Sequence, residues 1–136
     1  MASIRKEVSL SRDPDAVWDA FADVGQVHTR LAPGFVTDCR LEEGARVVTF
    51  FNGYVARELI VDVDPARRRL AYSVAGGQAS HHHATFEVLA DAHGSRVVWT
   101  ADVLPAEVAP VFDMMMSQGV EAMSRALQTP NSTHSG

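Results

Sequence analysis

The chain has 136 residues, which suits one domain and allows roughly two-thirds of the unfolded surface to be buried. A formal net charge of −5 and an isoelectric point near 5.6 argue against nucleic acid or an anionic membrane surface as a partner. The single cysteine, Cys39, excludes an internal disulfide and is typical of a reducing compartment. Because no apolar segment has the length of a membrane span or signal peptide, we expect a soluble cytoplasmic protein without membrane insertion.

The N-terminal part predicts a strand followed by two short helices. Residues 4–10 alternate loosely between apolar and polar side chains, as a strand does. Asp13 is a candidate N-cap with Pro14 at the first helical position, so a helix should begin there. Gly25 breaks this helix, and residues 26–31 predict a shorter helical piece.

The dipeptide Asn52-Gly53 is the strongest turn signal in the chain. It predicts a two-residue hairpin turn in which both residues have positive φ. Such a turn fixes the strand register and places Val47 opposite Glu58 on one face. Both faces of this hairpin carry apolar residues, so the pattern alone leaves open which face is inside.

The later strands show a clearer period of two. Successive side chains of residues 35–42 point to opposite faces of a strand. Each of the three strands after the hairpin has one face whose residues are mainly apolar. We expect the set that includes His82 to face inward, and we expect Phe86 and Trp99 to be buried. The three sets are Leu70, Tyr72 and Val74; His82, Ala84, Phe86 and Val88; and Val97, Trp99, Ala101 and Val103.

The last part of the chain predicts a long amphipathic helix over residues 106–127. Pro110 is tolerable because it falls in the first turn. Met115 marks the middle of a wide apolar face that also carries Phe112 and Gly119. A mid-helix glycine indicates either a close packing contact or room for a ligand, and we favour the packing contact. The opposite face is polar, with Asp113, Ser117 and Glu121.

The order of elements predicts an α+β fold. The predicted order is one strand, two short helices, six antiparallel strands and a long helix. The seven strands form an antiparallel sheet, and another element must cover one of its faces. The terminal helix is the element long enough to cover it, and a strongly twisted sheet curling around that helix leaves a cleft. We expect a single domain over residues 1–128 and a disordered tail over residues 129–136, which has nothing to bury.

Several segments together resemble a known superfamily. They are Val17-Trp18, Pro33-Gly34-Phe35, Arg57-Glu58-Leu59, and residues 69–74, 81–84 and 99–105. In this combination the chain is similar to the SRPBCC superfamily, and in particular to its polyketide cyclase/dehydrase-like proteins. The resemblance covers residues 4–127 and implies the helix-grip, or START-like, fold. It implies no one function, because this fold hosts carriers, receptors and cyclases.

A more distant similarity to the abscisic acid receptors of that superfamily implies pocket positions. Glu58 matches a pocket glutamate, which implies that its face of the hairpin is concave. His82 falls near a pocket tyrosine, and Arg30 falls near the lysine that pairs with the hormone carboxylate. The receptors' longer gate loop is reduced here to residues 51–54, so we do not expect a hormone-type latch. The remaining matches to pocket-lining positions are Tyr72, Val74, Met115 and Gly119.

Three consecutive histidines raise the question of a metal site. On a strand His81 and His83 share one face while His82 points to the other. Zinc requires three or four convergent ligands, and the face with His81 and His83 offers only Thr85 and Glu87 on the same strand. We therefore expect solvated histidines and no metal site. No motif for a nucleotide, phosphate or other cofactor is present, so we expect no cofactor.

Glu58 and His82 are the ionisable pair that we place inside the cleft, and His28 is a third candidate from the helical segment. Two interpretations stay open: a hydrogen-bond network that orients a ligand, or a general acid/base couple. Only in an enzyme would Glu58 and His82 be catalytic. The predicted ligand-binding set is His28, Arg30, Glu58, Tyr72, Val74, His82, Ala84, Phe86, Trp99, Phe112, Met115 and Gly119.

We expect the protein to bind a small hydrophobic molecule in its internal cleft. The alternative is a cofactor-independent enzyme, a polyketide cyclase or dehydratase that uses Glu58 and His82. A third interpretation is a protein-interaction module of the same fold, which a filled interior with an exposed apolar patch would favour. Whether the protein acts as a monomer or a homodimer stays open at this point.

Overall fold

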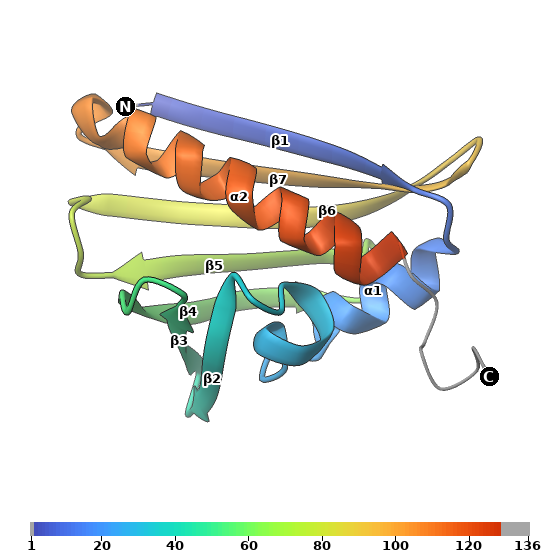
Figure 1. Cartoon of the computed structure of the whole chain (residues 1–136), viewed down its shortest axis with the longest axis horizontal. Coiled ribbons are helices and arrows are strands. Elements are labelled where there is room, and N and C mark those ends of the chain that lie inside the picture. Colours follow the sequence, from blue (N-terminus) through green and yellow to red (C-terminus); the bar gives the residue numbers. More distant parts are fainter. Residues whose placement is uncertain (1, 129–136) are drawn as a thin grey trace.

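Residues 2–128 are described by a computed structural model, in which they form a seven-stranded antiparallel sheet wrapped around a long helix (Figure 1). The strand order β1-β7-β6-β5-β4-β3-β2 places the first strand beside the last. This architecture confirms the predicted α+β helix-grip fold. The predicted disordered tail lies outside the described residues. The strands are β1 (Ala2–Leu10), β2 (Val36–Glu42), β3 (Ala45–Phe50), β4 (Val55–Asp64), β5 (Arg69–Ala75), β6 (His81–Asp91) and β7 (Gly94–Leu104).

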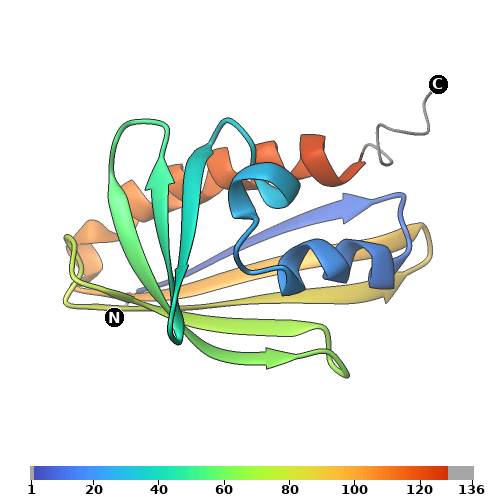
Figure 2. The ribbon, with the colours of Figure 1, turned by 90° about the horizontal axis from the view of Figure 1, so that it is seen from below.

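Two short helices connect β1 to β2. The helix α1 (Pro14–Ala22) begins as predicted: the Asp13 carboxylate accepts hydrogen bonds from backbone N–H groups of the first turn, and Pro14 occupies the first helical position. The predicted shorter piece is η1 (Val27–Leu31), a turn of π-helix. As Figure 2 shows, α1 lies under β6 and β7, while η1 lies between β2 and the long helix.

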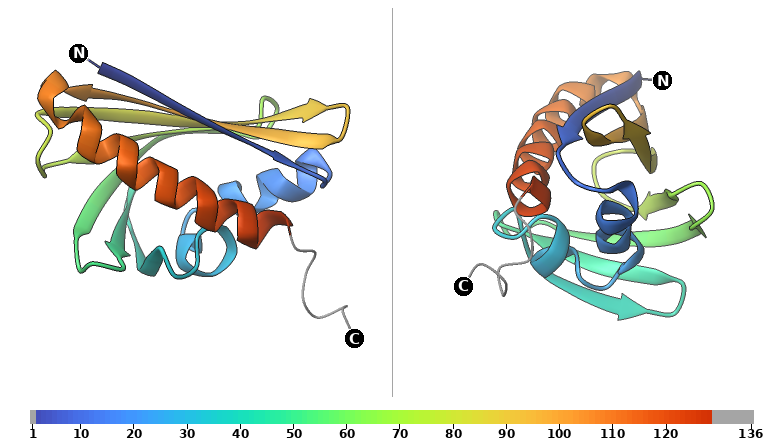
Figure 3. Two further views of the ribbon diagram at one scale, coloured as in Figure 1. Left: turned by 45° about the horizontal axis from the view of Figure 1, so that its top comes forward. Right: turned by 90° about the vertical axis from the view of Figure 1, so that its right-hand side faces the viewer.

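The long helix α2 (Ala109–Gln128) crosses the concave face of the sheet. It follows a 3₁₀ turn, η2 (Ala106–Val108), so that Pro110 lies in its first turn as predicted. In the end-on view of Figure 3 the sheet forms an arc, and α2 lies across the open side of that arc. Within residues 2–128 no helix is long and apolar enough to cross a membrane.

A stack of aromatic rings forms the centre of the core. Phe86 and Trp99 stack at 4.8 Å between ring centroids, and Tyr72 stacks on Phe86 at 6.0 Å. Trp99 is 9% exposed and Phe86 is 2% exposed, which confirms that both are buried. These rings come from β5, β6 and β7, so the stack runs across the middle of the sheet.

Gly119 permits α2 to approach this stack closely. A Cβ at this position would lie 3.0 Å from Cζ3 of Trp99 and 3.2 Å from a ring carbon of Phe35. A larger side chain would collide with these rings. Glycine has a low helix propensity, but at this position it lets the helix backbone lie close to the aromatic stack. The favoured interpretation of Gly119 as a packing contact agrees with this geometry.

The buried face of α2 is rotated relative to the predicted one. The prediction centred this face on Met115, whereas Met115 is only partly buried and Val111 and Met114 are exposed. The helix packs against β1 on one side. There the Asp113 carboxylate forms an ion pair with the Lys6 ammonium at 2.6 Å. The buried helix residues are Met116, Gly119, Ala122, Met123 and Leu127.

The turn between β3 and β4 corrects the predicted two-residue hairpin. The backbone N–H of Phe50 donates to the carbonyl of Tyr54 at 2.8 Å, so the loop consists of Phe51, Asn52 and Gly53. Of these three residues, Gly53 has a positive φ, of 86°. The Asn52 side chain accepts a hydrogen bond from the backbone of Tyr54 at 3.1 Å. Asn-Gly here belongs to a three-residue loop, the next most common hairpin connection.

The longer loop shifts the register by one residue. Arg46 lies opposite Glu58, and Val47 lies opposite Arg57. The prediction had placed Val47 opposite Glu58. Because side chains alternate along a strand, a one-residue shift exchanges the two faces of β3. Arg46 therefore points into the concave interior, and Val47 points out.

Candidate ligand-binding site

A cavity of about 190 Å³ lies between α2 and the concave face of the sheet. The β3–β4 hairpin, η1 with the segment that follows it, and the central strands supply its walls. Most lining side chains are apolar or aromatic. Eight of the twelve predicted binding residues line it: Glu58, Tyr72, Val74, His82, Phe86, Trp99, Phe112 and Met115.

The cavity opens to the surface between three elements. The exposed residues Asn52 and Tyr54 from the hairpin, Gln78 from the β5–β6 turn and Val111 from α2 all line it, so the mouth lies where these elements meet. Tyr54 Oη rests so close to Gly77 that a Cβ there would collide with it. The hairpin and the β5–β6 turn therefore touch beside the mouth.

Arg46 and Glu58 form a buried ion pair in the cavity wall. The Arg46 Nε–H donates to Glu58 Oε1 at 2.8 Å. Only 3% of the Arg46 side chain and 10% of the Glu58 side chain are exposed. The partner of Glu58 is thus an arginine on the neighbouring strand, which balances its charge, whereas the prediction had paired Glu58 with His82.

Tyr72 connects this ion pair to the aromatic stack. Its hydroxyl accepts a hydrogen bond from Trp99 Nε1 at 3.1 Å, and the Arg46 guanidinium carbon lies 5.4 Å from the centre of its ring. Burial, reinforced by the nearby Glu58 charge, raises the pKa of Tyr72 far above its ordinary value of 10. The Tyr72 hydroxyl therefore stays protonated and can act as a hydrogen-bond donor.

His82 faces the cavity from β6. Its ring meets Phe112 of α2 edge-on at 4.8 Å, and Tyr72 lies 6.5 Å away. Burial, with a smaller effect from the flanking His81 and His83, lowers the pKa of His82 to about 4. His82 is therefore a neutral imidazole near pH 7. Within residues 2–128 no hydrogen bond or ion pair joins it to Glu58.

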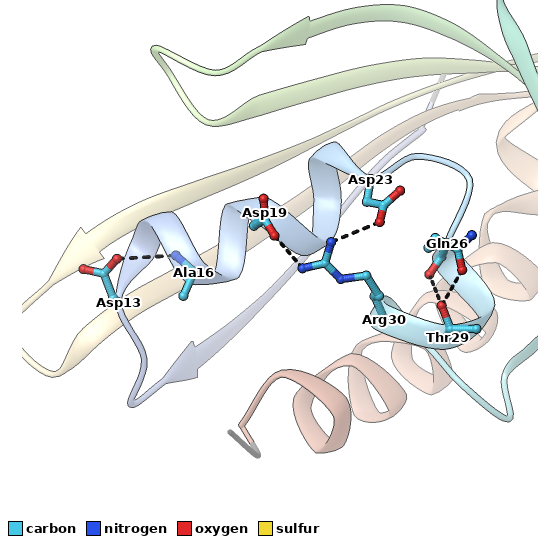
Figure 4. A network of polar contacts seen from close by, with 7 residues as sticks. All are labelled: Asp13, Ala16, Asp19, Asp23, Gln26, Thr29 and Arg30. Carbon is cyan, nitrogen blue, oxygen red and sulfur yellow. Dashed lines mark hydrogen bonds and ion pairs between the residues drawn. The ribbon is translucent and has the colours of Figure 1, made fainter. Parts of the chain in front are cut away.

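Arg30 lies outside the cavity, on the surface of the helical segment. Its guanidinium forms ion pairs with Asp19 at 2.6 Å and with Asp23 at 3.0 Å, as Figure 4 shows. The hydrogen bonds to Asp19 and then to Asp23 raise the pKa of Arg30. This arginine joins η1 to α1 and does not take the position that the hormone-receptor resemblance implied.

Three further predicted residues also lie outside the cavity. Ala84 is 1% exposed within β6, and Gly119 packs on Trp99. His28 sits in η1, where its Nδ1 is buried and has no hydrogen-bond partner among the described residues. These three residues shape the packing around the cavity instead of facing it.

The histidines of β6 point to both faces of the sheet, as predicted. His81 is exposed, and His83 lies with it on the face away from the cavity. Across residues 2–128 no three histidine, cysteine or carboxylate side chains gather in a way that could hold a metal ion. The absence of a bound metal stays a prediction.

Sequence reasoning missed Arg46. This residue is the one charge within the apolar run Ala45-Arg46-Val47-Val48, and it lines the cavity with 2% of its surface exposed. A lone arginine in an apolar strand was the available signal, because a buried arginine needs a carboxylate partner. The wrong hairpin register hid that partner.

Comparison with known protein families identifies the family of this chain. The sequence model of the family described as polyketide cyclase/dehydrase and lipid transport matches residues 1–129. The chain belongs to this family. No curated protein sequence matches the chain.

Solved structures with the same helix-grip fold include proteins of several kinds. An uncharacterized protein from Bacillus thuringiensis has a TM-score of 0.82 at 16% identity, with 94% of this chain and 100% of that chain covered. The major latex-like protein 151 of Panax ginseng has a TM-score of 0.75 at 17% identity, with 95% and 98% covered. A norcoclaurine synthase from Thalictrum, solved with a transition-state analogue, has a TM-score of 0.66 at 19% identity, with 91% and 92% covered. At these identities the likeness shows the fold alone.

Proposed function

We propose that the protein binds a small, compact hydrophobic molecule in the cavity between its sheet and α2. The cavity itself carries this proposal. Its volume is about 190 Å³, and an apolar protein cavity of roughly 150 Å³ accommodates benzene. A ligand of one or two rings, or an aliphatic molecule of similar volume, fits this space.

The arrangement of polar groups supports a binding role. Ligand sites are mostly apolar with a few placed polar groups, and here Glu58, Tyr72 and His82 face the cavity among aromatic and methionine side chains. Methionines such as Met115 and Met116 adapt to ligands of different shape. Family membership agrees, because the family description includes lipid transport.

An enzymatic function is the second candidate, and His82 is the observation that favours it. His82 is a neutral imidazole that faces the cavity and can accept a proton there, although its pKa of about 4 makes it a weaker base than an ordinary histidine. Glu58 is less suited to proton transfer, because Arg46 holds one of its oxygens. A cofactor-independent cyclase or dehydratase would therefore depend on His82 more than on the Glu58–His82 pair. Product formation that disappears in His82→Asn would support this alternative.

The proposal is tested with a substitution on β4 that places a large side chain inside the cavity. Ala56 of β4 is buried and lines the cavity, whereas the neighbouring Val55 points outward and is 54% exposed. A panel of neutral one- and two-ring compounds is screened for those that raise the melting temperature of the wild type. For the compounds found, we expect Ala56→Phe to weaken calorimetric affinity by about tenfold or more, or about 1.4 kcal/mol.

Val55→Phe is the matched control, because it adds the same ring to the outer face of the same strand. It should leave affinity unchanged. Native mass spectrometry of freshly purified protein should in addition reveal a retained small molecule. The proposal fails if no compound stabilises the wild type and none is retained, or if Ala56→Phe binds as well as the wild type.

A further inference from the structure

The cavity wall contains two opposite charges that are already paired. Arg46 and Glu58 lie directly opposite each other on β3 and β4, and both line the cavity. Their contact of 2.8 Å between Nε and Oε1 is nearly closed to solvent. In such surroundings, a charge in contact with its partner presents little net charge to a third group.

The remaining contacts of Arg46 hold it in this pairing. Its Nη1 donates to the backbone carbonyl of Val24 at 3.3 Å, in the segment between α1 and η1. Its guanidinium also lies over the ring of Tyr72. These contacts come from different elements, so a ligand anion would have to displace Glu58 to gain the full charge of the arginine.

The second oxygen of Glu58 is left for a ligand. No hydrogen bond from residues 2–128 reaches Glu58 Oε2, although Oε1 is bound by Arg46. The Tyr72 hydroxyl accepts from Trp99, and its own hydrogen finds no acceptor within the described chain. This part of the cavity thus offers one acceptor, a carboxylate oxygen, and one donor, a phenolic hydroxyl.

We propose that Glu58 determines the specificity of the cavity and makes it selective for neutral ligands that carry a hydrogen-bond donor. Glu58 balances the charge of Arg46, so that no net positive charge is left to attract a ligand carboxylate, and its second oxygen accepts a hydrogen bond from a ligand hydroxyl or amide. This inference rests on the proposed function, because it concerns a ligand of the same cavity. A carboxylate beside Glu58 would have to enter in its protonated form.

The test uses two probes of the same shape that differ in charge, 2-naphthylacetamide and 2-naphthylacetic acid. Both have two rings, in keeping with the cavity volume of about 190 Å³. At pH 7.5 we expect the wild type to bind the amide at least ~30-fold more tightly than the acid, because suppressing ionisation of a carboxyl group by one to three pK units costs about 10- to 1,000-fold in affinity. Titration calorimetry measures both affinities.

Glu58→Gln keeps the shape of the side chain and an oxygen for Arg46, but it leaves the guanidinium charge unbalanced. In this variant the preference should fall below ~3-fold or reverse in favour of the acid, because the arginine can now bind a carboxylate. The double variant Arg46→Gln/Glu58→Gln should keep the preference for the amide, because neither charge remains to attract the acid.

Glu42→Gln is the matched control for breaking an ion pair of the same kind. Glu42 Oε1 accepts from Arg57 Nε at 2.9 Å on the exposed part of the same sheet, away from the cavity. The wild-type selectivity should persist in this variant.

Three results would overturn the inference. The first is equal binding of acid and amide by the wild type, which requires no variant and leaves the proposed function intact. The second is wild-type selectivity retained in Glu58→Gln, and the third is selectivity lost equally in Glu42→Gln. Binding of neither probe to any of these proteins would instead count against the proposed function, and the inference would fail with it.

Discussion

Three polar residues that face the cavity, Glu58, Tyr72 and His82, each have a different partner. Glu58 has Arg46 beside it, the Tyr72 hydroxyl has Trp99, and His82 meets the ring of Phe112. The first two contacts are hydrogen bonds, which a buried polar group needs to avoid a large desolvation cost. The contact with Phe112 supplies no hydrogen bond, so burial is the main influence on the charge state of His82.

His82 should make the protein sensitive to acid. Its pKa is about 4 in the folded chain, against an ordinary value of 6.5. As the pH falls from about 6.5 to 4, the unfolded chain binds a proton at this site before the folded chain does, so unfolding is favoured. We expect the melting temperature of the wild type to fall across this window more steeply than that of His82→Asn.

His93→Asn is the control for this experiment, because His93 lies exposed in the turn between β6 and β7. Its pH profile should match that of the wild type. Identical slopes for wild type and His82→Asn between pH 6.5 and 4 would show that burial does not suppress the charge of His82.

At this scale the sequence predicted most of the cavity residues but not their partners. Strand alternation and the family resemblance placed Tyr72, His82 and Trp99 in the interior, because a period of two survives small errors in strand ends. Arg46 was missed, because its orientation depends on a register that one loop residue changes. Arg30 was misplaced, because alignment with a receptor lysine carries no information about the nearby carboxylates of α1.

At the scale of elements, the contact between β7 and α2 determines how closely the helix covers the sheet. The Trp99 ring packs directly beneath Gly119, and it also stacks on Phe86 and donates to Tyr72. One side chain thus joins three strands to the helix. Its loss would leave a cavity larger than the one already present, which the helix cannot fill without moving.

Trp99→Ala should therefore lower the free energy of unfolding by ~3–5 kcal/mol, a large part of the ~5–15 kcal/mol typical of a domain. Trp99→Phe keeps an aromatic ring and loses the hydrogen bond to Tyr72, so its effect should be smaller. Urea unfolding monitored by circular dichroism measures both. A loss below ~1 kcal/mol for Trp99→Ala would mean that α2 is held mainly by other contacts.

The sequence predicted which strands and main helices exist within residues 2–128, but it did not predict how they are oriented. Caps and periodicity located α1, α2 and the strands, because these signals are local. The rotation of α2 about its axis was not predictable from a wide apolar face, since contacts with β1 select which part of that face is buried. The Asn52-Gly53 signal located the hairpin but not the length of its loop.

At the scale of the whole molecule, an arc of sheet and one crossing helix enclose a cavity whose lining is mostly apolar. The same fold occurs in proteins with quite different names, including a latex-like protein and a synthase. The fold therefore provides the enclosure, and the side chains within it determine what the enclosure does. In this chain the Arg46–Glu58 ion pair and the neutral His82 distinguish the interior from a purely apolar one.

Methionines provide the most direct test of whether ligands enter this cavity. Met115, Met116 and Met123 line it, whereas Met114 belongs to the same helix but is 58% exposed. Protein labelled with ¹³C at the methionine methyl groups is titrated with 2-naphthylacetamide and followed by NMR. We predict shifts for Met115, Met116 and Met123, because an aromatic ring beside them changes their local field, and little change for Met114. Shifts confined to Met114, or none at any methionine, would contradict the account.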